Sequence, residues 1–259
     1  MTTATLTRPI KTALEEIQNL SILTGRTVSA FFRPPFYWRD TWVQMDVIGV
    51  GSLIIVSLTG IFTGMVLALQ SSVQLSDFGA SLFVGQLVSA SVVRELGPVL
   101  TALMVAGRVG SGIAAELGSM RVSEQIDALE AMGTDPIKKL VKPRVQAGLV
   151  MLPALTLITD AIAIFGGQLI AWLTLNQGFS TYWNSALNGL FFSDLFTGLA
   201  KPFVFGFIIT IVACYMGLRT TGGTAGVGKS TTQAVVVASV LVLASDFFLT
   251  KLFIEIFGH

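Results

Sequence analysis

The sequence is poor in the residues on which most enzyme sites and covalent frameworks depend. Among its 259 residues there is one cysteine, Cys214, and one histidine, His259. A single cysteine excludes an internal disulfide and a cysteine-based zinc site. A single histidine excludes a histidine metal cluster, and its place as the last residue argues against a histidine-based catalytic triad. We therefore expect no enzymatic activity and no bound cofactor.

Charge is also scarce. Asp, Glu, Lys and Arg make up 12% of the chain, and 53% of it is hydrophobic, whereas soluble domains carry about 25% charged residues. Most of the surface should therefore face lipid. A net charge of +1 argues against nucleic-acid binding, which needs a strong basic excess. We expect an all-α membrane protein that forms a single domain over residues 1–259.

The N-terminal residues have no apolar core of the signal-peptide kind and include Glu15 and Glu16. Over residues 10–32 the apolar side chains recur at helical spacing, but the segment is too polar to span a bilayer. It could lie in the membrane interface or pack as a soluble helix on the rest of the chain. Aromatic residues mixed with Arg33 and Arg39 follow at once. This pattern is typical of headgroup depth and favours the interfacial helix.

Five apolar runs can cross a membrane, which takes about 20 residues. They cover residues 47–69, 82–108, 145–175, 202–218 and 234–257, with a short connector at 71–81 and a loop at 176–200. Thirteen of the 16 basic residues lie before the first run, between the second and third, or between the fourth and fifth. The positive-inside rule then predicts a cytoplasmic N-terminus and a C-terminus on the other side.

Small residues recur at every fourth position in two places. Small side chains at this spacing let helices approach closely inside a membrane. The sequence therefore predicts two tight helix contacts, one through Gly60 and Gly64 and the other through Ala106, Gly110, Ala114 and Gly118.

Arg94 and Glu95 lie next to each other inside the second apolar run. Because a charge at the centre of a bilayer costs about 2.5–3.5 kcal/mol on insertion scales, neither should face lipid tails. They could compensate each other, pair with Asp160 or Asp246, or form a polar spot in a cavity that contacts a charged headgroup. Pro98 should bend the helix nearby. Lys201, at the predicted start of the fourth span, is expected as an interfacial residue, with phosphate contact the less favoured interpretation.

A short amphipathic helix is predicted over residues 123–133. Ser123 suits its N-cap, Gly133 suits the residue after its C-terminus, and Asp135 with Pro136 should begin the next helix. Its apolar face must pack on this chain or on a partner, and the pattern leaves both open. That face carries Val122, Ile126, Leu129 and Met132, and the opposite face carries Glu124, Gln125, Asp127 and Glu130.

The stretch from Gly223 to Ser230 matches G-x-x-x-x-G-K-[ST], the phosphate-loop motif, letter for letter. That motif binds phosphates between a buried strand and a helix of an α/β domain. Here it lies between two membrane runs, which leave no room for a parallel sheet. We interpret it as a Gly-rich turn in which Ser230, Thr231 or Thr232 caps the last span.

The motif RELGPVLTALMVAGRVGSGIAAELGSMRVSEQIDALEAMGTDP, from Arg94 to Pro136, resembles the MlaE/YrbE-type permeases. GIFTGMVLALQ (60–70) and GTAGVGKSTTQAVV (223–236) support the resemblance. These permeases are the membrane subunits of ABC lipid transporters that work with MCE-domain proteins. The resemblance implies a multi-pass protein of the bacterial inner membrane, a second copy of the chain, a cytoplasmic ATPase dimer, a periplasmic MCE-domain ring, and phospholipid or a similar lipid as cargo.

Carried over to this sequence, the resemblance makes residues 123–133 a coupling helix that contacts the ATPase. The residues concerned are Ser123, Glu124, Ile126, Asp127, Leu129, Glu130 and Met132. Arg94, Glu95 and Lys201 become residues of a lipid cavity, in which Arg94 and Lys201 contact anionic oxygens and Glu95 meets an ammonium group or holds Arg94.

Two other functions compete with lipid transport by an ABC permease. One is a stand-alone carrier or channel with an ion path through Arg94, Glu95, Asp160 and Asp246. The other is a structural membrane anchor for a periplasmic ring.

Overall fold

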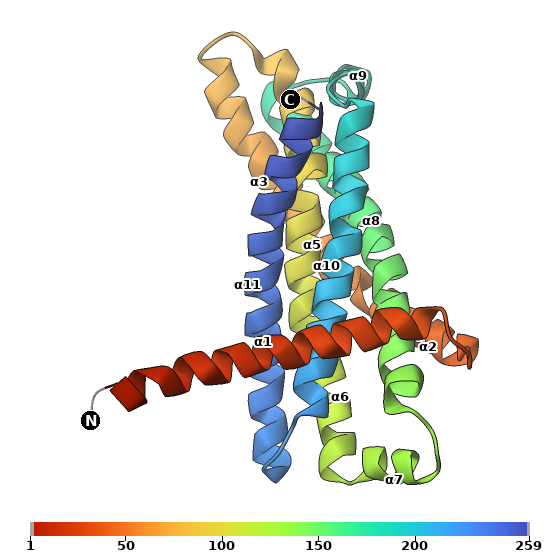
Figure 1. Ribbon diagram of the computed structural model, residues 1–259. Helices are drawn as coiled ribbons and strands as arrows, with labels where there is room; N and C mark the ends of the chain where they lie inside the picture. Colours follow the sequence, from red (N-terminus) through yellow and green to blue (C-terminus); the bar gives the residue numbers. More distant parts are fainter. Residues whose placement is uncertain (1–2, 258–259) are drawn as a thin grey trace.

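The computed structural model describes residues 3–257, and every regular element in that range is helical (Figure 1). Short 3₁₀ turns at Val50–Ser52 (η1) and Ser81–Phe83 (η2), and π-helical turns at Val92–Leu96 (η3), Ala106–Gly110 (η4) and Ile137–Val141 (η5), join α-helices into longer rods. The α-helices are α1 (Thr3–Phe31), α2 (Trp38–Ile48), α3 (Leu53–Ser76), α4 (Val84–Ser91), α5 (Gly97–Val105), α6 (Ser111–Val122), α7 (Gln125–Ala131), α8 (Lys142–Leu175), α9 (Phe179–Asn188), α10 (Phe192–Leu218) and α11 (Gly223–Phe257).

Five helical segments of the described chain are long and apolar enough to cross a membrane, the number that the sequence predicted. They are Trp38–Ser76, Ser81–Val122, Ile137–Leu175, Phe192–Leu218 and Gly223–Phe257. All five extend beyond the predicted apolar runs. Polar residues are tolerated where a helix leaves the hydrocarbon, so hydropathy falls before the helix ends.

The segment at 176–200 is not a simple loop. It contains α9 and the first turns of α10, which begins at Phe192. Lys201 therefore lies well inside the fourth span and does not open it. The sequence prediction took Lys201 as a boundary because its charge is unfavourable in lipid. That charge is instead neutralised inside the protein.

The stretch with phosphate-loop letters is helical, because Gly223 to Ser230 form the first turns of α11 and α10 precedes them. Gly222 and Gly223, with φ of +86° and +68°, make the turn between the two helices. The predicted cap was wrong, since residues 230–232 lie inside the helix. Thr231 and Thr232 donate hydrogen bonds to the carbonyl of Gly228 at 2.7 and 3.1 Å. A strand followed by a free loop, which phosphate binding needs, does not occur in the described chain.

The bundle has two distinct ends (Figure 1). One carries α7 and the turn before α11, and we call it the α7 end. The other carries α9 and the C-terminal end of α11, and we call it the α9 end. Helix α1 lies across the long helices near the α7 end, with Leu23 and Thr27 buried and Leu14 and Ile17 exposed. An apolar stripe that faces outward on a helix lying across the bundle fits the predicted interfacial helix.

Small residues lie where helices come closest. A Cβ atom on Gly64 would lie 1.8 Å from the carbonyl oxygen of Ala163 in α8, and one on Gly60 would lie 2.8 Å from that of Thr159. Ala106 and Ala114 are fully buried. A Cβ atom on Gly118 would lie 2.8 Å from Thr220 Oγ1, whereas one on Gly110 would come no nearer than 3.7 Å to Ile209. The approach of α3 to α8 therefore depends on the missing side chains.

We expect Gly64→Ala to force α3 and α8 apart, because the added methyl group would overlap the backbone of Ala163. Overpacking of this kind costs about 1–3 kcal/mol. Thermal unfolding in detergent should show a clear loss of stability. Gly112→Ala is the matched control, since a Cβ atom there meets nothing within 4 Å. Equal stability of the two variants would contradict the tight contact.

Candidate functional site

The second span changes its winding at the position of the charged pair. Arg94 and Glu95 lie in the π-helical turn η3, directly before Pro98 in α5. Proline has no N–H, so Pro98 cannot donate to the carbonyl of Arg94 four residues earlier. Lys201 of α10 supplies the missing donor, with its Nζ 3.0 Å from that oxygen. The backbone irregularity in the second span is thus coupled to a charged residue of the fourth.

Lys201 is the most deeply buried charge of this site, with 1% of its side chain exposed. Besides the carbonyl of Arg94, its Nζ contacts Glu95 Oε2 at 2.7 Å and Asp246 Oδ1 of α11 at 3.0 Å. The first two contacts are hydrogen bonds donated by the ammonium group, and Asp246 adds an ion pair. The predicted interfacial role of Lys201 is therefore wrong. It joins η3, α10 and α11.

Arg94 pairs with a residue that the sequence analysis did not single out. Its Nε lies 2.7 Å from Asp194 Oδ1, and its Nη2 donates to Asp194 Oδ2 at 2.9 Å. Asp194 also accepts the backbone N–H of Phe191 and so fixes the first turn of α10. It was missed because it lay in a predicted loop. An acidic residue three positions from a helix start, in a stretch without Lys or Arg, was the available signal.

The anticipated partners of the pair were only partly right. Arg94 and Glu95 do not neutralise each other, since Arg94 pairs with Asp194 and Glu95 with Lys201. Asp246 joins the cluster through Lys201. Asp160 does not join it. Asp160 is 7% exposed and lines a different cavity of about 220 Å³, where its Oδ1 has no hydrogen-bond partner in the described chain.

A cavity of about 290 Å³ opens over the charged cluster. Arg94 and Glu95 keep 39% and 41% of their side chains exposed, and Thr250 Oγ1 donates to Glu95 at 3.2 Å. The cavity thus has a charged floor and an apolar aromatic wall, which suits a ligand with a polar head and an apolar body. It is lined by Arg94, Glu95, Ser193, Asp194, Thr197, Lys201, Thr250, Phe253, Ile254 and Phe257.

At the α7 end, the short helix begins later than predicted, at Gln125. Ser123 is not its N-cap, because its hydroxyl donates to the carbonyl of Ser119 in α6 at 2.8 Å. The chain turns sharply between α6 and α7 through Glu124, whose φ is +59°. The far end follows the prediction. Gly133 has φ of +76°, and Asp135 Oδ1 accepts the N–H of Ile137 at 2.9 Å.

The apolar face of α7 is divided between the inside and the outside of the chain. Ile126 is 3% exposed and Leu129 packs against the same core, whereas Met132 is 72% exposed. Glu124, Asp127 and Glu130 are exposed as well. The inner part of α7 thus fastens it to its own bundle, and only the outer part is free to meet another protein.

Comparison with known proteins matches residues 41–252 to the family described as Permease MlaE. The chain belongs to the MlaE permease family. The match covers all five membrane-spanning helices almost completely.

Relatives of the permease come from bacteria and a plant. It is 45% identical over 242 residues to a "Probable ABC transporter permease protein" of Rickettsia bellii, with 93% of each chain covered. It is 42% identical over 212 residues to the "Intermembrane phospholipid transport system permease protein MlaE" of Haemophilus influenzae, covering 81% of this chain and 80% of the relative. It is 37% identical over 237 residues to "Protein TRIGALACTOSYLDIACYLGLYCEROL 1, chloroplastic" of Arabidopsis thaliana, covering 92% and 68%.

We expect Lys201→Met to destabilise the permease strongly, because Glu95 and Asp246 would lose their common cation. Removing one partner of a buried ion pair costs about 3–5 kcal/mol. Thermal unfolding in detergent measures the loss, and Glu95→Gln with Asp246→Asn should restore part of it. Lys251→Met, at an exposed position of α11, is the control. If Lys201→Met unfolds at the same temperature as the unaltered permease, Lys201 does not link the three helices.

Proposed function

We propose that the permease is the membrane subunit of an ABC transporter that moves phospholipid, or a related lipid, between the inner membrane and a periplasmic MCE-domain partner. The observation that carries the proposal is the cavity with its half-exposed Arg94 and Glu95, buried Lys201 and aromatic wall. The name of the Haemophilus influenzae relative supports phospholipid as cargo, and that of the Rickettsia bellii relative supports an ABC transporter. The periplasmic partner rests on the family resemblance.

The cavity can divide a phospholipid between its charged and apolar parts. Asp194 accepts one hydrogen bond from Nη2 of Arg94 and forms an ion pair with it through Nε, so the remaining Nη hydrogens of the guanidinium can bind a headgroup phosphate. Glu95 is placed to meet an ammonium group. Phe253 and Phe257 offer an apolar surface to the glycerol and upper acyl region. Lys201 is buried and contributes positive charge from beneath the cavity.

In this proposal a separate cytoplasmic ATPase dimer hydrolyses ATP. Helix α7 contacts that dimer and is displaced when the dimer changes conformation. The contact would be made by the exposed residues Glu124, Asp127, Glu130 and Met132. Ile126 and Leu129 pack on the core that includes Ile113 and Leu117 of α6, so displacement of α7 would pass into the second span. This assigns the α7 end to the cytoplasm, with the N-terminus, and the α9 end to the periplasm, with the C-terminus.

A second copy of the chain is part of the proposal. Within one chain, only 28% of the most apolar stretch of the first span is buried, and only 11% of that of the last span. Lipid or another copy must cover the remainder, and the family resemblance favours a homodimer.

A stand-alone carrier or channel is the competing function. It needs Arg94, Glu95, Asp160 and Asp246 along one path, but Asp160 lines a separate cavity. Lipid or ion movement by the purified chain alone in liposomes would support that alternative and contradict the ATPase-driven permease.

For the cavity, we expect Arg94→Gln to weaken the binding of a fluorescent phospholipid by about 10- to 100-fold. The variant loses a charge-assisted hydrogen bond of about 1.5–3 kcal/mol. Titration of the purified permease in detergent measures the change. Lys251→Gln, an exposed position outside the cavity, should bind normally. If Arg94→Gln binds lipid as the unaltered chain does while remaining folded, the proposed headgroup contact is wrong.

For the coupling helix, we expect Met132→Glu to abolish co-purification of a co-expressed ATPase, because a charge would enter an apolar contact. Met132→Leu should retain the ATPase. Ile126 is unsuitable for this test, since it is buried in its own core and a charge there would disturb the permease itself. Unchanged recovery of ATPase with Met132→Glu would place the contact elsewhere.

A further inference from the structure

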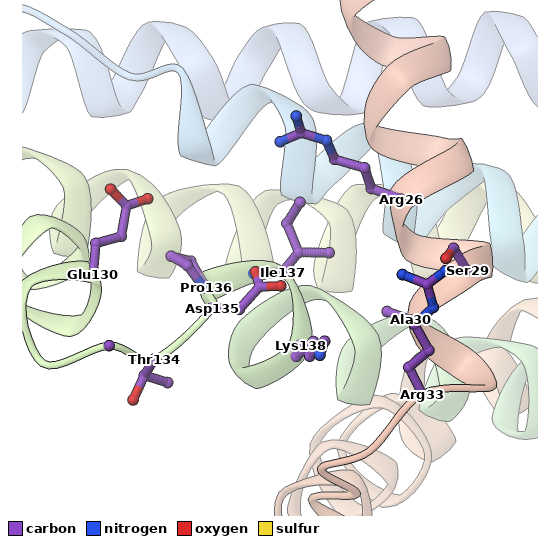
Figure 2. A pocket seen from close by; sticks show the side chains of 11 residues that line it. Arg26, Ser29, Ala30, Arg33, Glu130, Thr134, Asp135, Pro136, Ile137 and Lys138 are labelled. Atoms are coloured by element: carbon purple, nitrogen blue, oxygen red, sulfur yellow. The ribbon is translucent and has the colours of Figure 1, made fainter.

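A larger cavity, of about 540 Å³, lies at the α7 end, far from the charged cluster. It is an open cavity, bounded by the C-terminal end of α1 and the residues after it on one side and by the chain that follows α7 on the other (Figure 2). Arg26, Ser29 and Ala30 of α1 and Arg33, just after it, line one side, and Glu130, Gly133, Thr134, Asp135, Pro136, Ile137 and Lys138 line the opposite side.

The two arginines of this cavity are not used by the fold. Arg26 and Arg33 are exposed, and neither forms an ion pair with any residue that the structure describes. Figure 2 shows both guanidinium groups on the side of α1 where Asp135, Ile137 and Lys138 lie. One carboxylate oxygen of Asp135 already accepts a hydrogen bond from the N–H of Ile137. The lining carries three basic residues, with Lys138 the third, and two acidic ones, Glu130 and Asp135, so positive charge is in excess.

The neighbouring lysines behave differently. Lys139 pairs with Asp40 and lies 4.4 Å from the ring centre of Tyr37. Lys142 donates to the carbonyls of Arg33 and Pro35 and lies over the ring of Phe36. These lysines connect η5 and the start of α8 to α2 and the chain before it, and both already have partners. Arg26 and Arg33 remain for a ligand, and the planar guanidinium is well suited to phosphate oxygens.

Exposed aromatic residues indicate the depth of the cavity in the membrane. Phe32, Trp38 and Trp42 are 83%, 63% and 68% exposed, and they follow directly after the part of α1 that lines it. Aromatic residues gather at headgroup level. Basic pockets between membrane helices on the cytoplasmic side bind the headgroups of anionic lipids.

We propose that this cavity binds the phosphate-bearing headgroup of an anionic phospholipid from the cytoplasmic leaflet. The headgroup would contact Arg26 of α1, Arg33 just after α1, and Lys138 in the segment after α7. It would so fasten the end of the interfacial helix to the segment that follows the coupling helix. The site relies on the proposed orientation of the α7 end, but not on lipid transport, because the transport cavity lies at the α9 end.

The test places the full-length permease in phosphatidylcholine nanodiscs with increasing phosphatidylglycerol and follows hydrogen exchange of residues 22–33 and 130–138. Phosphatidylglycerol should slow exchange in both segments. Arg26→Gln with Arg33→Gln should weaken phosphatidylglycerol binding by about 30-fold, from about 1 kcal/mol for each basic residue at an anionic surface, so the double variant should stay unprotected at phosphatidylglycerol fractions that protect the unaltered permease. Arg39→Gln, an exposed arginine of α2 outside the cavity, should change it little. Glycerol phosphate in solution should give no protection.

Three results would overturn the proposal. An equal effect of Arg39→Gln would show attraction to the whole surface without a site. Protection by glycerol phosphate alone would show a site for soluble anions. Protection that appears only with the ATPase, whatever the lipid, would make the cavity part of a protein interface. The transport proposal is tested separately at Arg94, so either proposal can fail while the other stands.

Discussion

The arrangement of the permease depends on one buried ammonium group. Lys201 lies in the middle of a membrane-spanning helix with almost none of its side chain exposed. A lone charge there would be strongly unfavourable, so its position requires the carboxylates of Glu95 and Asp246 and the carbonyl of Arg94. These acceptors come from two other spans. The need to neutralise Lys201 therefore fixes how η3, α10 and α11 sit together, and that junction forms the floor of the cavity.

The second span connects the two ends of the molecule. It carries Arg94 and Glu95 in one π-helical turn, continues through a second such turn at Ala106–Gly110, and ends at the sharp corner that leads into α7. π-Helical turns are rare in proteins, and those that occur are often found at functional sites. Small residues along α6 keep this span closely packed, with Ala114 fully buried. In the proposed coupling, a displacement at α7 would pass along this closely packed span toward the charged cluster.

Several features could be predicted from the sequence because they depend on neighbours along the chain. An irregularity near Pro98 is local, and the end of α7 followed Gly133 and Asp135 as expected. Side-chain partners on different helices were harder to predict from the sequence. Asp194 is 100 residues from Arg94, and nothing in its immediate surroundings marks it as a partner of that arginine. Ser123 was misassigned because a serine that caps the start of one helix and a serine that follows the end of the preceding helix look alike in sequence.

The sequence by itself determined that this is a helical membrane protein with five spans, and its central motif determined the family. Composition, hydropathy and a long motif are properties of the linear chain. Only the tertiary structure decided that Lys201 is a buried link, that Asp160 stands apart, and that Ile126 faces inward while Met132 faces outward. These outcomes depend on which helices meet and at what rotation, because burial and ion pairing are set by distances between residues that are remote in sequence.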